Sequence, residues 1–133
     1  MGRSGYSDDC DNVAMWRGTV ASSIRGRRGQ VFLRELLTAL DAMTEKRLIP
    51  DELELSGEVC AIGALGRQRG VDMSKMDPND GDQVAAAFDI ARHLALEVVY
   101  MNDEVGRWQT PEQRWQRMRG WVAAQIKQAL VSA

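Results

Sequence analysis

The chain is poor in the residues that usually build metal, cofactor or disulfide sites. It has two cysteines and one histidine among its 133 residues. Cys10 and Cys60 lie far apart, and neither has a second cysteine or a histidine at the spacing of a metal ligand. These shortages predict reduced thiols, no bound metal and no cofactor.

Long apolar runs and a strong charge of one sign are also missing. No run reaches the roughly 18 apolar residues of a membrane span, and the polar start of the chain does not have the pattern of a secretion signal. The formal net charge of -2 gives no overall attraction to nucleic acid or to an anionic membrane. We therefore expect a cytoplasmic protein that binds no membrane, and any nucleic acid would need a local basic patch.

The remaining composition is that of one globular domain. Apolar residues make up 44% of the chain and charged residues 27%, without a low-complexity tract. A chain of this length buries roughly two thirds of the surface that its unfolded form exposes. We expect a polar N-terminal arm over residues 1–10 and a single helical domain over residues 11–133.

Apolar residues recur at helical spacing in the first half of this domain. Trp16, Val20 and Ile24 share one face of a predicted helix that starts near residue 11 or 12 and ends near Gly26. Residues 26–29 read as a break between helices. The next helix has the strongest apolar stripe of the chain, made of Phe32, Leu33, Leu36, Leu37, Leu40 and Met43.

Residues 59–66 are apolar but rich in small side chains, and two interpretations compete. The segment is either a buried strand or a buried helix in which Gly63 and Gly66 let another backbone come close. Ala61, Leu65 and the following residues 67–69 favour the helix, and Gly70 is a natural helix end.

The second half of the chain predicts two further helices. Asp80 and Gln83 resemble a capping box, and apolar residues then follow one face of a long central helix near residues 82–101. The last helix has Thr110 as its N-cap, Pro111 in its first position and Gln113 three residues after the cap. The predicted fold is all-α, a compact irregular bundle of about five helices.

Three segments together resemble a family of small uncharacterised proteins encoded by phages and prophages. They are residues 58–66, with the pattern Cys-Ala-x-Gly-Ala-Leu, residues 100–104, with Asn-Asp, and residues 110–115, which begin Thr-Pro-Glu. Residues 3–12 add to the likeness. The resemblance implies a small protein of a bacterial host cytoplasm that binds and modulates a host or phage component, such as a defence system, and it implies no catalytic residue.

Two acidic segments invite a metal interpretation that their spacing does not support. Asp8, Asp9 and Asp11 lie in the N-terminal arm, but they have neither the glycine nor the terminal glutamate of an EF-hand loop. In residues 77–82 the glycine is at the fifth position of the segment, whereas an EF-hand loop needs it at the sixth. Helix capping is the better explanation of both segments.

Arg25, Arg27 and Arg28 form the only concentrated basic patch, with Arg34 further along. Three interpretations stay open: contact with nucleic acid or phosphate, a protein-binding patch, or a merely solvated turn. A Walker-type phosphate loop is excluded because its Gly-Lys-Ser/Thr signature is missing.

Single residues that suggest chemistry have plainer explanations. A hydrolase or transferase would need Cys60 or a pair of carboxylates to converge with His93, and nothing in the sequence argues for that. Asn102 and Asp103 are expected to end the long helix.

The expected function is therefore a non-enzymatic protein-binding module, and the alternative is a small nucleic-acid-binding regulator that uses the turn at residues 25–28. Homodimer formation stays open. Trp115 fits the core, but Trp108 lies in the turn and Trp121 off the apolar stripe, and large aromatics at such positions can anchor a partner. The candidate partner-binding residues are Tyr6, Asp8, Asp9, Arg25, Arg27, Arg28, Trp108 and Trp121.

Overall fold

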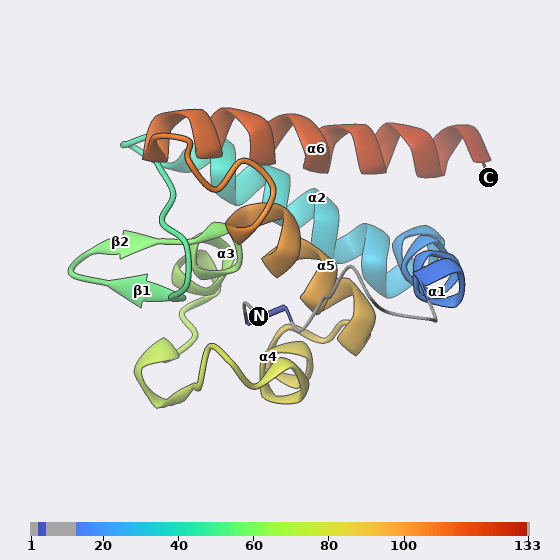
Figure 1. The fold of residues 1–133 in the computed structure, drawn as a ribbon, viewed down its shortest axis with the longest axis horizontal. Helices are drawn as coiled ribbons and strands as arrows, with labels where there is room; N and C mark the ends of the chain where they lie inside the picture. Colours follow the sequence, from blue (N-terminus) through green and yellow to red (C-terminus); the bar gives the residue numbers. More distant parts are fainter. Residues whose placement is uncertain (1–2, 5–12, 133) are drawn as a thin grey trace.

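The computed structural model describes residues 3–4 and 13–132, and it confirms the all-α class (Figure 1). A hairpin of two-residue strands and one short 3-10 helix interrupt the helices. The elements are α1 (Val13–Arg25), α2 (Arg27–Ala42), β1 (Glu54–Leu55), β2 (Glu58–Val59), α3 (Ala61–Arg69), η1 (Met73–Lys75), α4 (Gly81–Phe88), α5 (Arg92–Asp103) and α6 (Pro111–Ser132). None of the described helices is both long and apolar enough to cross a membrane.

The first two helices have the predicted inward faces, but the break between them is shorter than predicted. Val20 and Ile24 are buried. Only Gly26 separates α1 from α2, so the expected break over residues 26–29 is wrong. Gly29 lies in the first turn of α2, where a Cβ atom would come within 2.0 Å of the Ser23 backbone oxygen. This glycine permits close contact between two helices and does not form a turn.

The apolar stripe of α2 forms the middle of the core, as predicted. Phe32, Leu33, Leu36 and Leu40 are at most 1% exposed. Helix α2 packs mainly against α6 and α3, and α6 runs along it in Figure 1.

Helix α6 begins with the predicted capping box. The Gln113 amide donates to Thr110 Oγ1 at 3.2 Å, and the Thr110 amide donates to Gln113 Oε1 at 3.0 Å. Met118 and Val122 on its inward face are fully buried. The N-terminus of α6 is therefore defined by local sequence alone.

The small-residue segment is mainly a helix, which settles the alternative in favour of α3. A Cβ atom on Gly63 would lie 1.9 Å from the Leu53 backbone oxygen, and one on Gly66 would lie 2.6 Å from Met73 Sδ. Gly63 therefore permits the close backbone approach that the sequence predicts, whereas Gly66 makes room for side chains of Met73 and Phe88 and not for a backbone. Gly70 ends the helix in the left-handed conformation, with φ of 73°.

The predicted long helix near residues 82–101 is wrong, because the chain breaks it into α4 and α5. Asp89 adopts φ of 55°, and the Ile90 amide donates to the Ala85 carbonyl at 3.1 Å, which is the bonding pattern of a Schellman helix end. Ile90 is buried, so the apolar pattern continues across the break. No glycine marks this position, since aspartate also tolerates the left-handed region.

Helix α5 occupies the centre of the molecule. It packs against α1 and α4, and it also contacts α3 and α6. In Figure 1 it lies between α4 on one side and the α2 and α6 pair on the other. Its residues 94–99 are all buried, and its last two residues, Asn102 and Asp103, are each 1% exposed. Two polar side chains are thus enclosed at the C-terminal end of the central helix.

Candidate functional site

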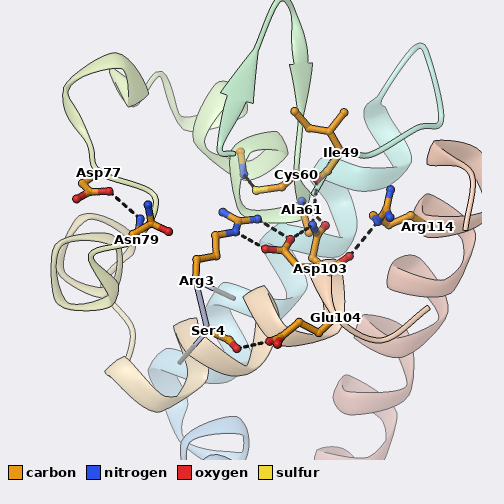
Figure 2. Close-up of polar contacts among 12 residues, drawn as sticks. Arg3, Ser4, Ile49, Cys60, Ala61, Asp77, Asn79, Asp103, Glu104 and Arg114 are labelled. Atoms are coloured by element: carbon orange, nitrogen blue, oxygen red, sulfur yellow. Dashed lines mark hydrogen bonds and ion pairs between the residues drawn. The ribbon is translucent and has the colours of Figure 1, made fainter. Parts of the chain in front are cut away.

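A buried ion pair joins the start of the chain to the end of α5 (Figure 2). Arg3 Nε and Nη2 donate to the two carboxylate oxygens of Asp103 at 2.5 and 2.9 Å, and the two side chains are 2% and 1% exposed. Ser4 donates to Glu104 next to this pair. Residues 3 and 4 are therefore packed against α5, whereas the rest of the predicted arm lies outside the described residues.

Asn102 connects three segments next to this ion pair. Its Oδ1 accepts from the Ala61 amide at 3.1 Å, at the first residue of α3. Its Nδ2 donates to the Ile49 carbonyl at 3.0 Å and to Asp103 Oδ1 at 2.7 Å. Asn102 and Asp103 do end a helix, as predicted, but their burial and their partners were not expected.

Arg114 of α6 completes the group, and it is 3% exposed. Its guanidinium donates to the backbone carbonyls of Asn102, Leu48 and Arg107 at 3.0, 3.2 and 3.4 Å. Burial lowers the pKa of Arg114, and the Asp103 carboxylate opposes this shift. We call Arg3, Asn102, Asp103 and Arg114 the buried arginine cluster. Its hydrogen bonds connect the start of the chain, residues 48–49, α3, α5, the turn at Arg107 and α6. Such a set of contacts is typical of a structural role.

Cys60 lies beside this cluster but is used as a helix cap. Its Sγ accepts from the Gly63 amide at 3.3 Å, and its side chain lies next to Arg3 in Figure 2. Burial lowers the pKa of Arg3, but the neighbouring Cys60 and Asp103 raise it by more, so the net shift is upward.

His93 is at the opposite end of α5, where its ring meets Trp16 edge-on with the centroids 4.8 Å apart. At 1.5 Å per residue, His93 and Asn102 are about 14 Å apart along the helix. Because Asn102 contacts Ala61, which follows Cys60, the histidine and the thiol belong to different ends of α5. The convergence that a thiol-dependent hydrolase would need is not formed.

The acidic segment that the structure describes, residues 77–82, forms a loop turn and the cap of α4. Asp77 Oδ1 accepts from the Asn79 amide at 2.9 Å, and Asp80 Oδ1 accepts from the Gln83 amide at 3.1 Å. Within residues 3–4 and 13–132, no group of three or more His, Cys, Asp or Glu side chains is placed to hold a metal ion. The candidate residues Tyr6, Asp8 and Asp9 lie outside the described residues.

Trp108 is the most exposed large apolar side chain among the described residues, at 95%. It lies in the turn between α5 and α6. Two arginines of α6 donate hydrogen bonds to residues of this turn. Arg114 donates to the Arg107 carbonyl, while Arg117 donates to Gln109 Oε1 at 2.6 Å and to the Met101 carbonyl. The tryptophan is thus presented on an ordered turn.

The other tryptophans of this region face the core. Trp115 is partly buried and donates from its indole nitrogen to the Leu40 carbonyl at 3.1 Å. Trp121 is also partly buried and packs against the core. Of the two candidate anchors, Trp108 and Trp121, only Trp108 has its ring fully available.

The predicted basic patch lies on the surface, at the junction of α1 and α2. Arg25, Arg27 and Arg28 are all exposed. Arg28 forms an ion pair with Asp89 at 3.1 Å, whereas Arg25 and Arg27 form none with any described residue. The sequence did not predict that the end of α4 would lie beside this turn.

A cavity of about 210 Å³ opens next to the patch, and we call it the arginine pocket. Its lining includes Phe32 and Phe88, which are each 1% exposed, and Val31, which is 52% exposed. Arg69 of α3 reaches it, donating to the Phe88 carbonyl at 3.2 Å and to Glu35. The full lining is Arg27, Arg28, Val31, Phe32, Arg69, Phe88 and Asp89.

A larger, open groove of about 460 Å³ lies between the end of α2, the hairpin and α3. Its two arginines are paired, Arg47 with Glu58 at 3.3 Å and Arg67 with Glu54 at 3.0 Å. The groove therefore has no unpaired positive charge among the described residues, unlike the arginine pocket.

Comparison with known proteins adds no relative. No protein-family model matches the chain, and neither the curated proteins nor the solved structures include a significantly similar one.

Proposed function

We propose that this protein is a non-enzymatic protein-binding module whose main anchor is Trp108. The observation that carries the proposal is the 95% exposure of this side chain on a turn held by Arg114 and Arg117. Covering the apolar surface of such a ring removes it from water, which favours association with a partner. Tryptophan is also enriched among the residues that dominate binding energy at protein interfaces.

The rigidity of the turn supports this role. The Gln109 amide donates to the Gly106 carbonyl at 2.9 Å, and the Arg117 side chain bonds to Gln109. A preorganised anchor loses little conformational entropy when it binds, so more of its contact energy contributes to affinity.

We extend the proposal to the biological setting that the sequence resemblance suggests. The protein is then of phage or prophage origin, acts in the cytoplasm of a bacterial host, and modulates a host protein such as a defence or regulatory component. The resemblance of residues 58–66, 100–104 and 110–115 is its support.

Site-specific photo-crosslinking tests the proposal. Benzoylphenylalanine is placed at position 108 and, as a control, at the exposed Gln116 of α6, and both variants are irradiated in host cells. We expect one discrete crosslinked protein from position 108 and none from position 116. Identification of that protein by mass spectrometry then allows its affinity to be measured directly.

Trp108→Ala supplies the second half of the test. Because the ring is almost fully exposed, this variant should keep its free energy of unfolding within about 0.5 kcal/mol of the wild type. Its affinity for the crosslinked partner should fall by about 30-fold or more, whereas Gln116→Ala should change it little. Equal affinities of the two variants, or no crosslink at position 108, would remove Trp108 as the anchor.

A further inference from the structure

The arginine pocket combines an apolar floor with an excess of positive charge at its rim. Three arginines, Arg27, Arg28 and Arg69, face a single aspartate among the lining residues, Asp89. Glu35 pairs with Arg69 from outside the lining. The rim therefore keeps positive charge after all these pairs are formed.

The existing ion pair across the rim is easily replaced. The side chains of Arg28 and Asp89 are 61% and 81% exposed, and such solvated pairs contribute little free energy. Arg27 has no carboxylate partner within the described part of the chain. Carboxylates of an incoming ligand could thus bind both arginines without breaking a strong contact.

The size and the floor of the pocket restrict what can enter it. Its volume of about 210 Å³ is below the roughly 300 Å³ at which ordinary small-molecule sites begin. Phe32 and Phe88 form the buried apolar floor of the pocket, and the half-exposed Val31 adds apolar surface to its lining. This space suits one apolar side chain of a larger partner.

We propose that the arginine pocket is a second docking site, which binds an acidic protein segment carrying one apolar anchor residue. The anchor fills the space above Phe32 and Phe88, and the flanking carboxylates bind Arg27 and Arg28. A polyanionic nucleic acid fits less well, because Asp89 lies within the rim and the apolar floor gives phosphates no partner. The site lies at the opposite end of α2 from the turn that carries Trp108, so neither proposal depends on the other.

A titration followed by amide NMR tests this assignment. The probe is a short synthetic peptide in which one phenylalanine is flanked by glutamates on both sides, and the reference peptide has alanine in place of phenylalanine. We expect shifts at residues 27–31, 69 and 88–89, and an affinity for the probe about fivefold or more above that for the reference. Moderate salt should weaken binding, because exposed charges are screened.

Matched variants decide whether the pocket itself is responsible. Arg27→Glu and Val31→Asp should each weaken probe binding by about tenfold. The control is Arg107→Glu, which makes the same change of charge as Arg27→Glu but in the turn before α6, and it should change the affinity less than about twofold. Circular dichroism confirms that each variant is folded. The proposal is overturned if pocket residues do not shift, if both peptides bind equally, or if a DNA or RNA oligonucleotide binds these residues more tightly than the probe. Such a failure leaves the crosslinking result at position 108 unaffected.

Discussion

The two ends of this molecule use arginine in opposite ways. In the buried arginine cluster, Arg3 and Arg114 are enclosed and bonded to a carboxylate or to backbone carbonyls. At the junction of α1 and α2, Arg25 and Arg27 are exposed and unpaired among the described residues. The sequence shows the same residue type in both places, so burial rather than local composition separates a structural arginine from one that is accessible to a partner.

The energetic reason lies in the surroundings of the charge. A buried guanidinium without its partner is strongly destabilising, so every element that contacts it is held in place. An exposed guanidinium is solvated, and its loss changes stability little. We therefore expect substitutions at one end to affect folding and substitutions at the other end to affect binding.

The largest effect is expected when the carboxylate of the buried cluster is removed. Asp103→Asn keeps the size of the side chain but leaves the charge of Arg3 uncompensated, which should lower the free energy of unfolding by about 3 to 5 kcal/mol. Urea denaturation measures this. The control is Asp89→Asn, which removes the carboxylate of an exposed pair and should stay within about 0.5 kcal/mol of the wild type. Similar losses in both variants would abolish the distinction between the two ends.

A smaller effect on stability should distinguish substitutions of the two glycines beside the exposed arginines. Gly29→Ala should destabilise the protein by about 2 kcal/mol, because its Cβ atom would collide with the Ser23 backbone oxygen. Gly26→Ala should cost less than about 1 kcal/mol, because the nearest atoms lie at 3.6 Å and only the preference of the N-cap of α2 for glycine over alanine is lost. Thermal unfolding of both variants would show whether the turn is a packed junction; equal midpoints would indicate a loose one.

The next effect on stability should come from the N-terminal cap of α6, the helix that carries Arg114. Thr110→Ala removes the side-chain cap of α6 and should lower stability by about 1 kcal/mol. Thr110→Ser keeps the hydroxyl and should recover most of the loss. If serine fails to restore stability, the cap hydrogen bond is not the reason for the effect.

The smallest effect is expected for an exposed arginine pair outside both regions. Arg119 donates to Asp41 at 2.9 and 3.2 Å, and this hydrogen bond lowers the pKa of Asp41 below its usual value of 3.8. Because the carboxyl has a lower pKa in the folded state, the pair stabilises the protein above about pH 4 and loses its effect as the pH falls further. The unfolding midpoints of Arg119→Met and the wild type should therefore differ slightly at pH 7 and converge near pH 3. A difference that grows in acid would contradict this sign.

Local signals in the sequence were sufficient for much of the fold. The capping box at Thr110 and Gln113 and the apolar stripe of α2 depend on residues only a few positions apart. The break at Asp89 was missed because aspartate takes the left-handed position that glycine usually marks. The apolar pattern also continued through Ile90.

The sites were less predictable because they depend on contacts between distant residues. Arg3 and Asp103 are 100 positions apart, and no local pattern links them. Arg69 and Phe88 join the predicted arginine turn only through tertiary structure, which packs α3 against α2 and places the end of α4 beside the turn. Trp108 precedes the cap of the last helix and Trp121 lies within that helix, but only the tertiary structure shows that the first is exposed and the second packed.

A pair of double-mutant cycles tests the difference between the two ends most directly. One cycle combines Arg3→Met with Asp103→Asn, and the other combines Arg28→Met with Asp89→Asn, with unfolding free energies measured under the same conditions. We predict a coupling energy of about 2 kcal/mol or more for the buried pair and below about 1 kcal/mol for the exposed pair. Equal coupling energies, or a larger value for Arg28 and Asp89, would contradict the account.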